Sequence, residues 1–419
     1  MLLSRCIAAA LGLGLLWSGP MGLVWAQEAP TTNLPAGGGE AEGNEFGDGA
    51  LDDVPPPVAS SSSVAGTGSL TSQLGFYSHS DSITDGNPYI DEDLWVVEPI
   101  VIWDYNVSDD WAYSVELAYD RVSSASIERL STKGAQSGAS GDNYVGLRYG
   151  SRHRVSPTEQ LDWHLGYSFE YDYRSIALGG GYSTRARDDS RSTSYSVDAY
   201  VDSLDLIRWD GTEDGGDNRF SVAGSWSHYR LLSPKWNGEL SSTLSYQSGF
   251  LATPYNPVAI EDGSTIGFNE LDVAFDGKAV DEILPDTRVR GSLSGRFRRH
   301  LGERRALELG GRVYADDWGI FSVTFEPRYR FGLGPNMDLA LGYRFYTQTA
   351  SDYWSEKFTT EPEFRTQDPD LGELDAHTLT TQLEWRTAPD KRWIYGLNYT
   401  LRSDGLDYLW AFVNWRWSF

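Results

Sequence analysis

Cysteine is nearly absent from this chain of 419 residues, in which Cys6 is the single one. Disulfide scaffolds and thiolate metal sites are therefore excluded. Lysine is also scarce, so that arginine supplies most of the 34 basic residues, and these are outnumbered by 60 carboxylates. The formal net charge of -26 leaves no basic stripe of the kind that displaces counterions from a nucleic acid. The composition therefore argues against a nucleic-acid partner.

Long apolar runs are missing as well. Beyond residue 66 no stretch approaches the roughly twenty apolar residues of a membrane-spanning helix. Only 40% of the chain is hydrophobic, and 13% of the chain is aromatic, while glycine is frequent with 44 residues. Such a chain has few aliphatic side chains for the interior of a globular enzyme. It suits a protein whose apolar surface is thin and faces lipid.

The N-terminal region is predicted to contain two segments that precede the folded domain. Residues 1–26 have Arg5, a short apolar run and Ala26 at a plausible cleavage site, which indicates a signal peptide and a mature chain without cysteine. Residues 27–66 carry acidic side chains, no Lys or Arg, and runs of Gly, Pro and Ser, which predicts disorder. We interpret this segment as a spacer or as a tether for a periplasmic partner.

Residues 67–419 show strict alternation of apolar and polar side chains. In the last segment Leu409, Ala411 and Val413 share one face, and Phe412 and Asn414 share the other. A period of two over about ten residues predicts a β-strand with one apolar face. Sixteen strands are expected, with fourteen or eighteen as alternatives, and they begin near residues 68, 89, 111, 142, 160, 175, 190, 218, 236, 286, 305, 319, 337, 374, 392 and 408.

The apolar faces could cover a soluble core or could contact lipid, and the connections favour lipid. Short connections at residues 106–110, 156–159, 302–304 and 389–391 alternate with long ones at 124–142, 249–285 and 350–374. Short periplasmic turns and long external loops are typical of outer-membrane barrels. The chain ends on an aromatic strand with Trp415, Trp417 and Phe419, which resembles the insertion signal read by the barrel-assembly machinery. The prediction is an all-β transmembrane barrel in the Gram-negative outer membrane, in contact with lipid and lipopolysaccharide.

Four motifs support a family resemblance. They are GFLATPY at residues 249–255, LPDTR at 284–288, YADDWGI at 314–320 and YRFYTQTASDYW at 343–354. Together they resemble an uncharacterised family of Gram-negative outer-membrane β-barrels, a domain of unknown function, and the resemblance spans residues 74–419. It implies the barrel fold and the outer-membrane location, and it implies no assigned activity.

The sequence gives little support to an enzymatic role. Asp375 and His377 share one face of a strand and could form an acid-histidine pair, but a polar pair at the rim explains them as well. The acidic loop at residues 210–217 offers hard oxygen ligands, yet it lacks the spacing and the closing Glu of a calcium-binding EF-hand loop. The sequence therefore predicts no catalytic residue, no metal site and no cofactor.

The polar faces of the strands predict a charged lumen. Alternation turns the following side chains inward: Glu308, Arg312, Glu326, Arg328, Arg330, Arg344, Glu384, Arg386, Arg402 and Arg416. They could form a ladder that selects solutes or one that only maintains strand register. The candidate constriction is the loop at 249–285, with Phe250, Tyr255, Glu261 and Asp262. The leading prediction is a conduit for a small polar or charged solute, the alternative is a non-conducting scaffold for a partner, and a membrane-embedded hydrolase is the third.

Overall fold

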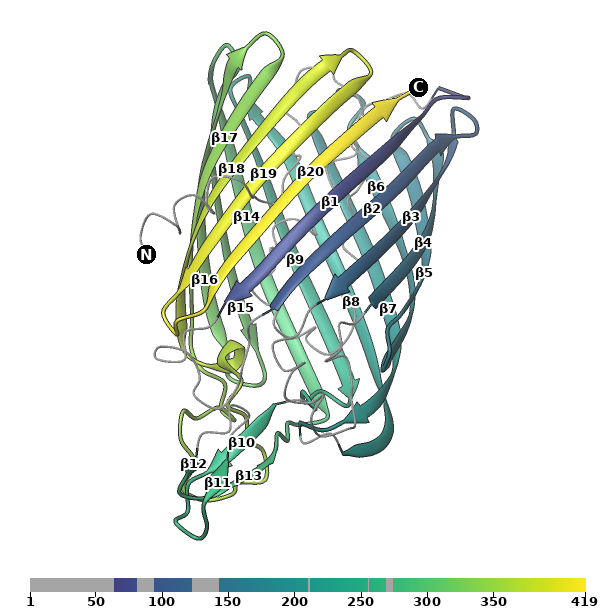
Figure 1. The fold of residues 1–419 in the computed structure, drawn as a ribbon. Coiled ribbons are helices and arrows are strands. Elements are labelled where there is room, and N and C mark those ends of the chain that lie inside the picture. The colour runs from purple at the N-terminus through teal and green to yellow at the C-terminus, as the bar shows by residue number, and fades with distance from the viewer. Residues whose placement is uncertain (1–63, 81–93, 123–142, 210–211, 255, 269–273) are drawn as a thin grey trace.

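The computed structural model describes residues 64–80, 94–122, 143–209, 212–254, 256–268 and 274–419. Within these residues the chain forms a closed antiparallel β-barrel (Figure 1) with sixteen strands in its wall. This confirms the predicted fold class and strand number. The predicted signal peptide and most of the acidic segment at 27–66 lie outside the described residues. No helix in the described ranges is long and apolar enough to cross a membrane.

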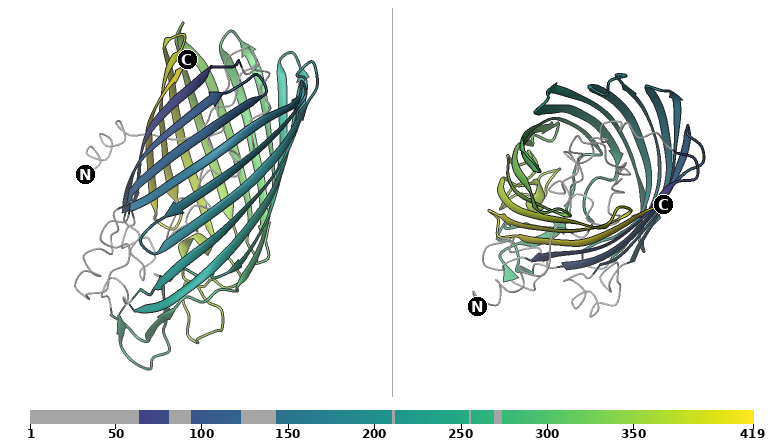
Figure 2. Two further views of the ribbon diagram at one scale, coloured as in Figure 1. Left: turned by 90° about the vertical axis from the view of Figure 1, so that its right-hand side faces the viewer. Right: turned by 90° about the horizontal axis from the view of Figure 1, so that it is seen from above.

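The wall strands follow one another in chain order, each hydrogen-bonded to the next. Their bounds are β1 (Gly68–Ser80), β2 (Leu94–Asn106), β3 (Trp111–Val122), β4 (Asn143–Ser156), β5 (Glu159–Phe169), β6 (Tyr173–Arg185), β7 (Arg191–Ile207), β8 (Glu213–Ser233), β9 (Trp236–Gly249), β14 (Thr287–Gly302), β15 (Arg305–Asp316), β16 (Phe321–Gly334), β17 (Met337–Gln348), β18 (Leu374–Ala388), β19 (Lys391–Arg402) and β20 (Asp407–Ser418). The strands are strongly tilted, and the view from above shows the ring that they form (Figure 2).

The ring closes between the first and the last strand. β1 pairs with β20 from Ser69 opposite Ser418 to Ser80 opposite Asp407. The backbone of Gly68 both donates to and accepts from that of Phe419, at 2.8 and 2.9 Å. Closure leaves no unpaired sheet edge, which is what allows strands to cross a membrane.

The outer surface carries an apolar belt. Leu178, Leu244 and Leu379, each near the middle of its strand, are 59%, 64% and 62% exposed. Aromatic side chains flank this belt at both ends. Trp103 packs edge-on against Tyr113 near the short turns, and the hydroxyl of Tyr343 lies 2.7 Å from Nδ1 of His377 near the long loops. An apolar band between two aromatic girdles is the surface of a transmembrane barrel.

The connections identify the two ends. Tight turns join β4 to β5, β16 to β17 and β18 to β19 at the end that carries the C-terminus (Figure 1). We assign this end to the periplasm and the opposite end to the cell exterior. Four short strands project beyond the wall there: β10 (Pro257–Ile260) pairs with β13 (Lys278–Asp281), and β11 (Gly267–Phe268) pairs with β12 (Ala274–Phe275). A single 3-10 turn, η2 (Pro369–Leu371), lies in the β17–β18 loop.

Candidate functional site

All four sequence motifs meet at the extracellular end of the barrel. Side chains from three of the motifs, together with Leu371, form a buried apolar cluster, and Tyr353 and Trp354 of the fourth motif pack against it. This cluster, here called the extracellular core, consists of Leu251, Leu284, Tyr314, Trp318, Ile320 and Leu371. Isolated bridges between Ile283 and Arg365 and between Ile260 and Phe358 join the β9–β14 loop to the β17–β18 loop. The two long loops therefore pack as one ordered unit on the ends of β14 to β17.

Asp316 is the polar centre of this core. Its carboxylate accepts hydrogen bonds from Nη2 of Arg288 at 2.6 Å, the hydroxyl of Tyr314 at 2.9 Å and the backbone N–H groups of Trp318 and Ile320. Both charged side chains are 0% exposed. The guanidinium of Arg288 also lies 4.2 Å from the ring of Trp318. A buried ion pair is tolerated where further hydrogen bonds satisfy its charged groups, as the four donors do for this carboxylate.

The turn that follows Asp316 requires glycine. Gly319 has φ of +93°, a conformation that side chains other than glycine rarely adopt. A Cβ at this position would also lie 2.7 Å from Oδ1 of Asp352 in the β17–β18 loop. The backbone N–H of Asp352 donates to the carbonyl of Trp318 at 2.8 Å, so the turn and the loop are in direct contact.

A second buried carboxylate links the loops. Glu282 is 2% exposed and accepts hydrogen bonds from the backbone N–H of Thr253 and from the hydroxyl of Thr366, both at 2.5 Å. Nearby, the side-chain carbonyl of Gln367 accepts from the backbone N–H of Ala259 at 2.7 Å. These contacts fix the paths of both loops without exposed charge.

Arg402, at the end of β19, links this strand to the same unit. Its buried guanidinium binds Asp370 in η2 and Asp404, and Nη1 donates to the hydroxyl of Tyr408 at 2.5 Å. Gln348 donates to the carbonyl oxygens of Asp370 and Gly372 at 2.8 and 2.7 Å. The buried guanidinium of Arg402 therefore forms ion pairs with two carboxylates.

Because two carboxylates share one guanidinium, we expect the stability of the β17–β18 loop around Asp370 to depend on pH. Burial raises the pKa of Asp370 to about 7, while Arg402 opposes the rise and Asp368 adds to it. Because the unfolded value is 3.8, the loop is most stable below about pH 4 and loses stability as the pH rises towards 7. We expect faster amide exchange at residues 370–372 at about pH 8 than at about pH 5, after correction for intrinsic rates. Asp370→Asn should remove the difference, and equal exchange at both values in the unsubstituted protein would contradict it.

The lumen face of β14 to β18 carries a ladder of ion pairs. Arg298 contacts Glu308 at 2.6 Å between Nη2 and Oε2, and Arg330 contacts Glu384 at the same distance. Arg386 binds Asp338. Further towards the exterior, Arg312 and Arg344 lie over the rings of Tyr314 and Tyr346, at 5.4 and 5.8 Å. Cross-strand pairs of this kind maintain register and also fix cationic groups along the wall.

The opposite wall is lined by short side chains. From β5 to β9 the buried inward positions are largely serines, with Ser168, Ser175, Ser183, Ser192, Ser194, Ser227 and Ser241 all below 10% exposure. Polar pairs also join strands of this wall, and Nε of Arg219 on β8 lies 3.0 Å from Oδ2 of Asp202 on β7. Nε2 of His164 on β5 lies 3.1 Å from Oδ1 of Asp198 on β7. They meet above Gly179 of β6, where a Cβ would lie 2.2 Å from both side chains. The two walls therefore differ in bulk and in charge.

The predicted lumen residues occupy three levels of the barrel. Glu308, Arg312, Glu326, Arg328, Arg330, Arg344 and Glu384 lie along β15 to β18 on the polar face. Arg386 and Arg416 lie near the periplasmic ends of β18 and β20. Arg402 is different, because its side chain is 0% exposed within the ion pairs of the extracellular unit and presents no charge to the lumen.

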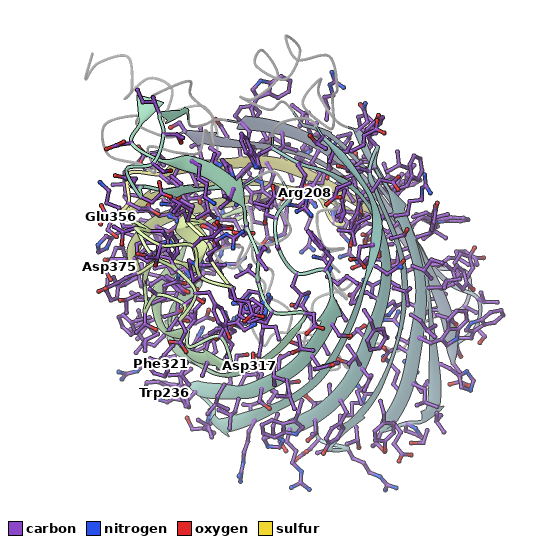
Figure 3. The ribbon with its side chains drawn as sticks, turned by 90° about the horizontal axis from the view of Figure 1, so that it is seen from below. Arg208, Trp236, Asp317, Phe321, Glu356 and Asp375 are labelled. Atoms are coloured by element: carbon purple, nitrogen blue, oxygen red, sulfur yellow. The ribbon has the colours of Figure 1, made fainter. Side chains whose placement is uncertain are left out.

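The predicted constriction residues are split between two places. Phe250 follows β9, and its ring lies 5.8 Å from the guanidinium of Arg208, which sits within the ring of strands in Figure 3. Glu261 pairs with Lys357 at 2.6 Å, and Asp262 accepts from Ser264. Both follow β10, which lies in the projection beyond the wall (Figure 1). Tyr255 lies outside the described residues.

The remaining predicted residues face outward. Trp415 packs 6.4 Å from Trp393, and Trp417 packs 5.1 Å from Phe419 at the periplasmic girdle, measured between ring centroids. Asp375 and His377 lie on the outer side of β18, where alternation along the strand places them with exposed Leu379. His377 contacts the hydroxyl of Tyr343 in the extracellular girdle.

Sequence reasoning missed the chemistry of the extracellular core. Arg288, Trp318 and Glu282 were not singled out, although two of them lie in motifs that carried the family resemblance. Inward arginines Arg296 and Arg298 were also missed, and alternation from Arg290 along β14 could have found them. The sequence signal for the core is the position of the motifs beside the long connections. That position alone does not reveal which residues contact one another.

Comparison with known proteins gives a family match and distant structural likenesses. The chain is similar to a bacterial polysaccharide outer membrane secretin, with 9% identity, a TM-score of 0.47, and 84% of this chain and 98% of that one covered. It is also similar to OccK1 from Pseudomonas aeruginosa (7% identity, TM-score 0.42, 84% and 98%) and to the P. putida toluene transporter TodX (9%, 0.38, 85% and 90%). No curated protein sequence matches. Residues 208–407, which contain all four motifs, match the family described as protein of unknown function (DUF3570).

Proposed function

We propose that this protein is an outer-membrane channel for small polar or charged solutes. The observation that carries the proposal is the uneven lumen, with arginines along β14 to β20 and short hydroxyl side chains along β5 to β9. Barrels of sixteen strands are wide enough that side chains need not fill the interior. Fixed cations along one wall create a transverse field that favours anions and orients dipolar solutes.

The route to the membrane is part of the same proposal. Export through a signal peptide cleaved after Ala26 would deliver the chain to the periplasm. The aromatic C-terminal strand would then be read by the barrel-assembly machinery, and the exposed belt would contact lipid and lipopolysaccharide. What supports this route is the aromatic strand β20 in the closing strand pair and the apolar exterior of the barrel.

Ion current through a planar bilayer tests the channel, with selectivity as the readout. Arg344→Ala removes a lumen cation, and an anion about 7 Å from it in a water-like dielectric would lose about 0.6 kcal/mol of attraction. A cation at the same distance would be freed of an equal repulsion, so we expect the ratio of anion to cation permeability to fall roughly eight-fold, for a difference of about 1.2 kcal/mol. Arg121→Ala, an exposed position of β3 next to outward Tyr119, is the matched control and should leave the ratio unchanged.

Two results would overturn the channel. One is a correctly folded barrel that carries no current, and the other is a current whose selectivity is the same in both variants. A silent barrel would favour the scaffold hypothesis. The projection formed by β10 to β13, where Ile266 is 72% exposed, would then be the first surface to search for a partner.

A further inference from the structure

Two carboxylates lie side by side on the lumen face of β2 and β3, in the extracellular half of the barrel. Val97 pairs with Arg121 in the ladder between these strands, and this register places Glu98 opposite Asp120. Alternation from outward Leu117, which is 50% exposed, turns Asp120 inward, and Glu98 with it. Like charges directly opposite each other destabilise a pair of strands. This acidic pair, Glu98 and Asp120, is therefore a position that an added positive charge stabilises.

No cationic side chain in the described part of the chain forms an ion pair with either carboxylate. Asp120 is 5% exposed, and its Oδ1 atom is buried without a hydrogen bond. The charges that act on Glu98 are those of Asp120 and Glu116, and both are negative. Tyr144 of β4 is opposite Asp120 and 2% exposed, and its hydroxyl is also buried without a hydrogen-bond partner. Because most buried polar atoms in proteins are hydrogen-bonded, these atoms indicate a place where a ligand can supply the partner.

The carboxylate of Glu98 lies over β1. Gly75 stands between Glu98 and Phe412 of β20 in the two strand ladders. A Cβ at this glycine would lie 3.1 Å from Oε2 of Glu98, so the absence of a side chain leaves room for the carboxylate. Glu98 is itself partly exposed. A solute in the lumen can therefore reach the acidic pair at this carboxylate.

Aromatic side chains continue the same inward surface across the seam between β1 and β20 (Figure 1). Phe412 packs with Trp410, and Trp410 is edge-on to Tyr77 with 6.1 Å between ring centroids. His79 stacks on Tyr408 at 4.4 Å. Nε1 of Trp410 and both ring nitrogens of His79 are buried without a hydrogen-bond partner. This aromatic patch, which consists of these five residues, combines rings with a few polar atoms, as small-molecule sites do, and aromatic faces attract cations.

We propose that the acidic pair and the aromatic patch form a binding site for an organic ammonium ion. The N–H groups of the ammonium donate to the carboxylates of Glu98 and Asp120, and its organic part lies against the rings of β20 and β1. The aromatic patch favours an organic cation over a metal ion, and in the described ranges no three acidic, histidine or cysteine side chains are placed to hold a metal. The site needs only the folded barrel, so it is independent of the conduction proposed above.

Equilibrium binding of phenethylammonium to the full chain in detergent tests the site, measured by isothermal titration calorimetry. Phenethyl alcohol has the same ring and carbon chain without the charge. It should bind at least about ten-fold more weakly, because hydrogen bonds between charged groups are stronger than those between neutral groups. Glu98→Gln with Asp120→Asn removes both charges and keeps the side-chain shapes. It should raise the dissociation constant of the ammonium about ten-fold or more.

The matched control is Asp162→Asn with Asp198→Asn. It also removes two negative charges from the lumen face, but from β5 and β7, where Asp198 contacts His164 and Asp162 lies over Gly181. The dissociation constant should stay the same in this control.

Three results would overturn the site. They are equal binding of the ammonium and the alcohol, equal dissociation constants in the two double variants, and no binding to the unsubstituted barrel. The last result would indicate that a proton shared between Glu98 and Asp120 relieves their repulsion. A barrel that binds the ammonium with the expected differences but carries no current would support the site and overturn only the channel.

Discussion

Arg288→Met is expected to open the extracellular core. The substitution leaves the carboxylate of Asp316 buried without its cation, and removal of one partner from a buried ion pair costs about 3–5 kcal/mol. It also removes the guanidinium that lies 4.2 Å from the ring of Trp318. The lost stability should appear as local unfolding of the turn and the two long loops. The barrel itself should stay folded, because the wall strands keep their ladder hydrogen bonds.

Amide hydrogen exchange at residues 314–320 measures this effect. Exchange there should accelerate by about two orders of magnitude or more, since 1.4 kcal/mol corresponds to a factor of about ten. Arg299→Met, an exposed position towards the periplasmic end of the same strand, where its guanidinium lies over Trp236, is the control and should leave this turn protected. Adding Asp316→Asn to Arg288→Met should recover part of the loss, because the buried charge is gone. Unchanged exchange in Arg288→Met would show that the pair does not hold the core.

Leu244→Arg should be the most damaging change on the barrel wall. Leu244 is 64% exposed near the middle of β9, where a membrane barrel meets the centre of the bilayer. An arginine on the lipid face at this depth costs about 2–4 kcal/mol. We expect the free energy of unfolding in phospholipid vesicles, measured by urea titration with tryptophan fluorescence, to fall by that amount.

Thr243→Arg provides the control for Leu244→Arg. Thr243 is the adjacent residue, faces the lumen, and lies 3.2 Å from the hydroxyl of Ser225 in the wall of short side chains. An arginine there enters a polar interior, so the loss should be well under half of that for Leu244→Arg. Equal losses at both positions would argue that the outer surface of β9 does not face lipid.

Alternation was sufficient to predict the barrel wall from sequence. Each strand needs an apolar outer face, so Leu409, Ala411 and Val413 reveal β20 without knowledge of its neighbours. The two strands predicted to begin near residues 175 and 190 are β6 and β7, and both are long, with their turn at Asp189, where φ is 54°. Strand ends could be placed because short periplasmic turns break the pattern sharply.

The extracellular core could not be predicted in the same way. By alternation Arg288 and Arg402 are lumen arginines like Arg344, and their sequence positions alone do not distinguish them. Their partners are Asp316, 28 residues away, and Asp370, 32 residues away, on segments whose paths depend on two long loops. Tertiary packing of loops, which has no periodicity, decides which arginines are withdrawn from the lumen and which remain there.

The strand pair that closes the wall also sets the order of events when the barrel is made. Ser69 contacts Arg416 and Gln73 contacts Asn414 across sequence separations of 347 and 341 residues. Neither contact can form before nearly the whole chain has been synthesised, and contacts of such separation form slowly. Until then β1 and whichever strand is last in place both present free hydrogen-bonding edges, which other chains can capture. The ring of strands therefore stays open until β20 has paired with β1.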